Sequence, residues 1–200
     1  PFLYQYGSFT ELSFSSMNYA LAAARVLKES PAGPDEAFST FFFTPDGGLT
    51  WQQSPQDSLP YCMSLAFPSA DRAYFLGRRA MVIVKKDLYP SLEMSTYGRA
   101  RFFRSTNQGS NWTEMPLPLD TLANLVFTGR EEGYLFGGGG TTPAAGFYKT
   151  LNGGETWEYT ALGLPSIQKG QIVNSNLMFL LTADSISAVY RAIKTGSGWD

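Results

Sequence analysis

The 200-residue sequence contains no histidine and one cysteine, Cys62. The absence of histidine excludes Ser-His-Asp and Cys-His catalytic arrangements and histidine-bound zinc. A single cysteine excludes an intramolecular disulfide. Because Cys62 lies beside Met63 and close to Leu65 in a strand-like stretch, we expect a small buried side chain and not a reactive thiol.

Long apolar runs and dense positive charge are also missing. No run approaches the ~20 apolar residues that span a bilayer, so we expect no membrane insertion. The net charge is −2 and the pI is about 5.2, which argues against nucleic acid as the main partner. Local basic pairs occur at Arg78-Arg79 and Lys85-Lys86. We interpret them as solvated strand and loop charge, with a patch for an acidic protein partner as the alternative.

The chain lacks the usual phosphate-binding and hydrolytic motifs. The glycine run 137–140 is not followed by Lys-Ser or a helix signal, so it predicts an interstrand loop. The acidic pairs Asp35-Glu36 and Glu131-Glu132 are adjacent in sequence and point apart, whereas glycosidase carboxylates must flank one bond. We therefore expect no enzyme activity, no catalytic residues, no metal and no cofactor.

The chain does contain one short motif, Ser/Thr-x-Asp/Asn-x-Gly-x-x-Trp, at 44–51, 105–112 and 150–157, with a shortened copy at 195–199. These residue types suit a tight turn in which a short polar side chain caps backbone N–H groups and glycine adopts a positive φ. Because a calcium site would need several carboxylates, the Asp/Asn positions are predicted to hold their turns. The tryptophans are predicted to anchor the turns against a sheet. The predicted structural residues are Asp46, Asn107, Asn152, Trp51, Trp112, Trp157 and Trp199.

The repetition extends beyond the turn. An apolar segment ends at Phe67, Phe127 and Val173, which lie 16, 15 and 16 residues after the preceding motif tryptophan. A second strand-like segment follows in each case, so we predict four repeats, approximately 8–51, 52–112, 113–157 and 158–199. The segment 19–27 is rich in helix formers, but the repeat alignment predicts a strand there.

These motifs resemble the Asp-box, or BNR, repeat of sialidases, sortilin-type receptors and photosystem assembly factors. In that family each box marks one blade of a β-propeller. The resemblance implies an all-β fold in one domain, 1–200, with four blades of four antiparallel strands. In the repeat pattern a strand follows each motif tryptophan, and the aromatic segment 2–6 occupies that position ahead of the first repeat. Residues 1–7 are therefore expected to supply the strand after Trp199, complete the last blade and close the ring. A fragment of a larger ring is the alternative.

The catalytic part of the sialidase resemblance is absent. Sialidases carry a Phe/Tyr-Arg-Ile-Pro motif near the N-terminus, and no such tetrapeptide occurs here. The resemblance therefore extends to architecture and not to sialidase activity.

The insertions at 28–36, 85–98 and 137–145 are expected between second and third strands, on the face opposite the boxes. Proline- and aromatic-bearing loops on a rigid scaffold are typical of recognition surfaces. We predict a protein-binding module, with an inhibitor, an immunity protein covering a toxin, or an assembly factor as examples. A carbohydrate-binding or glycosidase-related propeller is the alternative, and the sequence indicates no compartment. The candidate partner-binding residues are Lys85, Lys86, Leu88, Tyr89, Leu92, Tyr97, Arg78 and Arg79.

Overall fold

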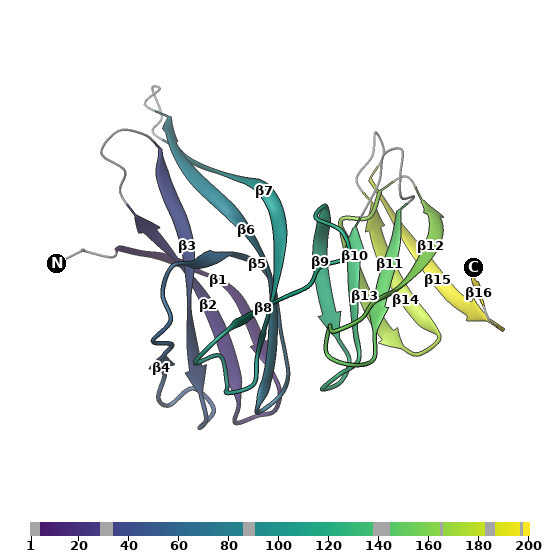
Figure 1. Cartoon of the computed structure of the whole chain (residues 1–200), viewed down its shortest axis with the longest axis horizontal. Helices are drawn as coiled ribbons and strands as arrows, with labels where there is room; N and C mark the ends of the chain where they lie inside the picture. The colour runs from purple at the N-terminus through teal and green to yellow at the C-terminus, as the bar shows by residue number, and fades with distance from the viewer. Residues whose placement is uncertain are drawn as a thin grey trace. The chain divides into compact units, whose positions relative to one another are not determined.

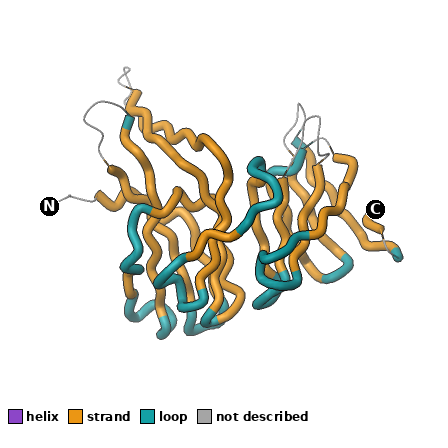
Figure 2. Tube along the Cα trace, viewed as in Figure 1, coloured by secondary structure: helices purple, strands orange, loops and turns teal. Residues whose placement is uncertain are grey.

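The computed structural model describes residues 5–28, 34–85, 91–137, 145–164, 166–182, 187–196 and 198–200. Across these residues the secondary structure consists of strands joined by loops and turns (Figure 2). All strand pairs with a recorded register are antiparallel. The predicted fold class, all-β with antiparallel four-stranded sheets, is confirmed.

The chain divides into two compact units, Pro1–Glu114 and Met115–Asp200. Each unit contains two of the predicted repeats, and the closure of all four repeats into one ring stays a prediction. The strands of the first two repeats are β1 (Gln5–Phe14), β2 (Ala20–Lys28), β3 (Asp35–Thr44), β4 (Gln52–Gln53), β5 (Leu59–Ser69), β6 (Arg72–Lys85), β7 (Ser91–Ser105) and β8 (Thr113–Met115). Those of the last two are β9 (Leu122–Phe127), β10 (Gly133–Gly137), β11 (Ala145–Thr150), β12 (Glu158–Leu164), β13 (Lys169–Asn174), β14 (Leu177–Thr182), β15 (Ala188–Thr195) and β16 (Gly198–Trp199).

Each repeat is a meander of four strands, and each motif turn joins the third strand to the fourth (Figure 1). The segment 19–27 is a strand as predicted, because β2 pairs with β1 and β3 along its whole length. Six of its nine residues are buried. Tertiary pairing therefore outweighs the helix propensity of its alanines.

In the first unit, the two repeats share one hydrogen-bonded sheet. The second half of β3 pairs with β4, whereas its first half pairs with strands of the next repeat. Phe38 and Ser39 face β5, and Asp35–Ala37 face β6. At one end of this β3–β6 pairing, two small buried residues, Ala37 and Ala80, lie directly opposite each other.

The core of the first unit lies between its two repeats and is strongly aromatic. Phe41 contacts Phe75 and Trp112, with ring centroids 4.9 and 4.6 Å apart. Phe75 also stacks on Phe103 at 4.5 Å. Leu21, from the first repeat, is fully buried in the same cluster. Buried aromatic pairs of this kind add packing energy beyond the area that they remove from water.

The second unit consists of two separate four-stranded sheets, ordered β12-β11-β10-β9 and β13-β14-β15-β16. Its core joins the sheets through Phe136, Phe147 and Met178. Gly170 allows a close approach, because a Cβ at this position would lie 2.5 Å from the Phe136 ring. The Gly170 N–H also donates to Oδ1 of Asn124 at 2.9 Å. Side chains therefore hold these two sheets together.

Two expectations about the chain's path are corrected. Gln5 and Tyr6 were expected in the sheet of the last repeat, but they continue β1 and pair with Leu27 and Val26. The reason is the length of β2, which continues to Lys28 and so offers Val26 and Leu27 as partners to residues that precede the predicted repeat. Phe2–Tyr4 lie outside the described residues.

The second correction concerns 85–98, which was expected to be a loop. In the structure, residues 91–98 belong to β7, and Lys85 pairs with Ser91 at the end of a long hairpin. The β-branched and apolar residues of 81–84 favour an extended strand, which carries the hairpin outward.

Candidate functional site

The three complete motif turns share one hydrogen-bond pattern. In the first, the Gly48 N–H donates to Oγ1 of Thr44 at 2.8 Å, and the Thr50 N–H donates to Oδ1 of Asp46 at 2.9 Å. The equivalent distances are 2.9 and 3.0 Å in the second turn and 2.9 and 3.0 Å in the third. In each turn the Ser/Thr hydroxyl also donates to the Asp/Asn side chain. These polar side chains therefore act within their own turns.

Backbone conformation explains the glycines of the motif. The two residues after the Asp/Asn have positive φ in all three turns, and five of the six are glycine. Gln108 is the exception, with φ of 63°. A side chain in this region is strained, so the second turn carries a cost that the other two avoid.

Asp46 is the charged member of the Asp/Asn set. Hydrogen bonds from the Thr50 side chain, the Thr50 N–H and the Thr44 side chain lower the pKa of Asp46 from 3.8 to about 2. Asn152 forms a similar link, in which its Nδ2 donates to Oγ1 of Thr156 at 2.8 Å. An amide can therefore replace the carboxylate in this turn.

The first and third motif turns lie beside the turn between the first and second strands of their repeats. Gly47 N–H donates to the Asn18 carbonyl at 2.8 Å, and Gly153 N–H donates to the Glu131 carbonyl at 2.9 Å. Within each unit, both kinds of turn therefore share one end of the sheets, and the second-to-third connections leave from the opposite end (Figure 1).

The motif tryptophans have different environments. Trp112 is 6% exposed and packs on Phe41 of the preceding repeat, and Trp199 packs on Phe147 of the preceding repeat, with ring centroids 5.8 Å apart. Trp157 is half-buried. Trp51 is 42% exposed. The tryptophan of the second repeat in each unit is therefore covered by the first repeat of that unit.

The part of the β6–β7 hairpin beyond its bulge carries Arg79, one of the predicted basic residues. Gly98, with φ of +77°, lies at a β-bulge where the register shifts between Gly77 and Arg79. Beyond it, Arg79 and Tyr97 pair across the hairpin, and the guanidinium lies 5.3 Å from the ring centroid. Nη2 of Arg79 also contacts Oε1 of Glu36 at 2.9 Å. This hydrogen bond raises the pKa of Arg79.

The other predicted partner-binding residues are placed less completely. Lys86, Leu88 and Tyr89 lie outside the described residues. Lys85 and Leu92 belong to the paired backbone of the hairpin. Arg78 lies at the bulge itself and pairs with Tyr61 of β5 on its other edge. The structure thus brings Arg79 and Tyr97 together, with Glu36, which sequence reasoning did not include.

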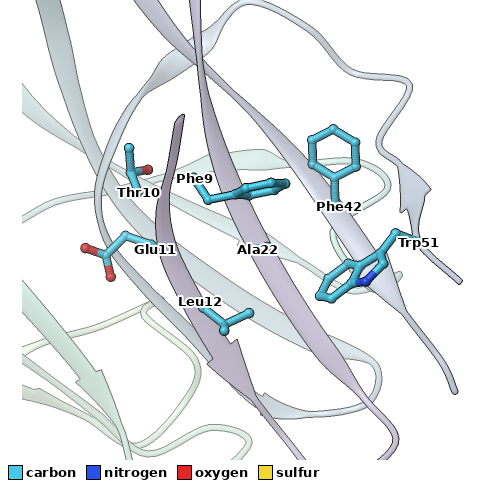
Figure 3. A pocket seen from close by; sticks show the side chains of 7 residues that line it. All are labelled: Phe9, Thr10, Glu11, Leu12, Ala22, Phe42 and Trp51. Atoms are coloured by element: carbon cyan, nitrogen blue, oxygen red, sulfur yellow. The ribbon is translucent and has the colours of Figure 1, made fainter. Parts of the chain in front are cut away.

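A second candidate surface, which sequence reasoning missed, is an apolar hollow on the outer face of the first sheet. Its volume is about 680 Å³. Figure 3 shows Phe9 and Leu12 on one side of Ala22, with Phe42 and Trp51 on the other. Thr10 and Glu11 complete the lining. The sequence feature that could have indicated this hollow is the motif, because it predicts a tryptophan packed against the sheet. The motif does not identify the residues that surround or cover that tryptophan.

The described residues contain no group of three His, Cys, Asp or Glu side chains that could hold a metal ion. Cys62 is 1% exposed, as predicted, and burial raises the pKa of its thiol. In the described part of the chain, no helix is long and apolar enough to cross a membrane.

No protein-family model matches the chain, and no curated protein matches its sequence. Among solved structures, the chain is similar to one described as "YCF48 bound to D1 peptide". The identity is 13%, the match covers 98% of this chain and 96% of that chain, and the TM-score is 0.35. At this identity and TM-score, the likeness carries no argument about what this chain binds.

Proposed function

We propose that this protein is a non-catalytic binding module that recognises another protein through the outward end of its β6–β7 hairpin. The observation that carries the proposal is the hairpin itself. β6 and β7 span 14 and 15 residues, whereas the corresponding strands β10 and β11 span 5 and 6. The part of the hairpin next to the bulge joins the two repeats, because Asp35–Ala37 pair with Ala80–Val82, whereas the paired strands continue past these contacts to Lys85 and Ser91.

The side chains at this end suit a protein partner. The Arg79 side chain is 64% exposed although it contacts both Glu36 and Tyr97. These contacts hold the guanidinium in one orientation before binding, which lowers the entropy lost when a partner is engaged. Arginine and tyrosine are also enriched among the residues that contribute most to protein interfaces.

The proposal is tested with the double variant Arg79→Ala/Tyr97→Ala. The full-length protein is used to capture partners from an extract of its source, and the affinity of any stoichiometric partner is measured by calorimetry. We expect the double variant to lose about 2 kcal/mol or more of binding energy, roughly thirtyfold in Kd, with little change in Tm.

Lys194→Ala provides a matched control, because Lys194 is an exposed cation on β15 of the second unit. This variant should bind the partner as the parent does. Equal binding by the double variant would contradict the proposal. Binding on a glycan array without any protein partner would favour the carbohydrate-binding alternative, and turnover of a bound ligand would contradict a non-catalytic role.

A further inference from the structure

Two of the motif turns contain residue pairs that react readily in unstructured chains, Asp46-Gly47 and Asn152-Gly153. In such a pair the backbone nitrogen of the glycine attacks Cγ of the preceding side chain, because glycine has no Cβ to hinder the approach. For asparagine, the new C–N bond closes a cyclic imide, the attacking nitrogen gives up its proton, and the side-chain amide leaves as ammonia. Water then opens the imide to aspartate or isoaspartate. Asn152 is therefore a candidate deamidation site.

The third motif turn restrains both reacting groups of this pair. The N–H of Gly153, whose nitrogen is the nucleophile, donates to the Glu131 carbonyl at 2.9 Å. The Asn152 amide is held at both ends, because Oδ1 accepts from the Thr156 N–H at 3.0 Å and Nδ2 donates to Oγ1 of Thr156 at 2.8 Å. For the attack, the nitrogen must leave the carbonyl and the amide must turn away from Thr156. The reaction therefore requires local opening of the turn.

The first motif turn restrains Asp46-Gly47 in the same way. The Gly47 N–H donates to the Asn18 carbonyl at 2.8 Å, and Oγ1 of Thr50 donates to Oδ2 of Asp46 at 2.6 Å. Hydrogen bonds from Thr50 also lower the pKa of Asp46, which keeps the side chain as a carboxylate, and a carboxylate resists the attack. In both turns with a reactive pair, a threonine hydroxyl four residues later holds the reactive side chain.

The second motif turn lacks these restraints and also lacks the reactive pair. Asn111 occupies the place of the threonine, so the hydroxyl is missing. Among the described residues, the Gln108 N–H donates to no backbone carbonyl. Gln108 also replaces the glycine, although its φ of 63° is strained for a residue with a side chain. Because that side chain hinders attack by its own nitrogen on Asn107, the strained residue supplies the protection that hydrogen bonds supply in the other two turns.

We propose that Asn152 is a latent deamidation site, kept unreactive by the hydrogen bonds of its turn, and that Gln108 prevents the same reaction in the second turn. The strain at Gln108 then has a chemical role. Aspartate at position 152 would fit the turn, since Asp46 makes the same one, whereas isoaspartate lengthens the main chain and would break it. The hairpin residues Arg79 and Tyr97 take no part, so this inference is independent of the proposed binding function.

Deamidation is measured by keeping the protein in warm, mildly alkaline buffer and mapping its peptides by mass spectrometry, which gives a separate rate for each asparagine. In the folded parent, Asn152 should react more slowly than in the same protein unfolded in urea. Thr156→Val removes the hydroxyl and should raise the Asn152 rate about fivefold, the change in open population expected for one lost hydrogen bond. Thr156→Ser retains a hydroxyl and should keep the parent rate.

A second set of variants tests the role of Gln108. Gln108→Gly introduces the Asn-Gly pair without the restraints, so Asn107 should then react faster than Asn152 in the same molecule. Adding Asn111→Thr should slow Asn107 again, by about fivefold. Thr160→Val is the control, because it removes a hydroxyl from β12 outside the turn, and both rates should stay at the parent values.

Equal Asn152 rates in the folded and the unfolded parent would overturn the proposal. So would an unchanged Asn152 rate in Thr156→Val, or an Asn107 rate in Gln108→Gly that does not exceed the Asn152 rate. An equal rise at Asn107 and Asn152 in Thr156→Val would also overturn it, because the hydroxyl would then act on the whole fold and not on its own turn.

Discussion

The two units build the same repeat pair in different ways. In the first, β3 pairs with strands of both repeats, so two meanders form one sheet. In the second, the described strands form two sheets that contact each other through side chains and the Asn124–Gly170 hydrogen bond. The motif turns are nearly identical in both. The difference therefore comes from strand length, since only a strand that continues past its own repeat can pair with the next one.

The largest expected effect separates Trp112 from Trp51. Trp112→Ala removes a buried indole from between Phe41 and Phe75 and should lower the free energy of unfolding by about 3–5 kcal/mol. Trp51→Ala should cost about 1 kcal/mol, because its indole already contacts water. Urea denaturation measures both. Equal losses would mean that the exposed tryptophan is covered in solution.

A smaller effect separates the glycines of the first two turns. A Cβ on Gly109 would lie 2.7 Å from Cδ1 of buried Leu21, whereas one on Gly48 would meet the Trp51 ring at 3.7 Å. Both residues have positive φ, so both alanine variants carry about 1–2 kcal/mol of backbone strain. Gly109→Ala should cost about 2 kcal/mol more than Gly48→Ala, because the second turn packs against the preceding repeat. Similar Tm values for the two variants would contradict this packing.

A gain is expected at Gln108. The first and third turns have Gly47 and Gly153 at the equivalent position, all three with positive φ. Gln108→Gly removes the strain, but part of this gain is offset because glycine loses more backbone entropy on folding. The protein should therefore become more stable by about 0.5–1 kcal/mol. Gln108→Ala keeps the strain and is the control. A lower urea midpoint for the glycine variant would show that the glutamine side chain makes a stabilising contact.

The smallest effect concerns pH. The folded pKa of Asp46 lies at about 2, below its ordinary 3.8, so the carboxylate contributes stability above pH 4 that is lost as pH falls towards 2. Asp46→Asn should match the parent at neutral pH, because Asn107 and Asn152 make the same turn, and should lose less stability in acid. Asp46→Ala should have a lower free energy of unfolding than the parent at every pH. Acid unfolding curves that coincide for the parent and Asp46→Asn would contradict this assignment.

Much of the fold could be predicted from local chemistry. The motif specifies a turn through hydrogen bonds between residues only two to four positions apart, so the turn, its polar pattern and the repeat boundaries follow from short-range contacts. The buried state of Cys62 followed in the same way from its apolar neighbours. The site was less predictable. Tyr97 was placed in a loop because nothing local shows that 91–98 pairs with β6.

What the sequence by itself determined is the repeated turn and the alternation that builds each four-stranded sheet, since both depend on neighbours along the chain. What only the tertiary structure decided is how sheets meet. Gln5 and Tyr6 join β2 because that strand is long enough to pair with them, and Trp112 is buried while Trp51 is exposed because only one of them has a preceding sheet in its unit. These outcomes depend on contacts between residues far apart in the sequence, which the same eight-residue motif cannot encode.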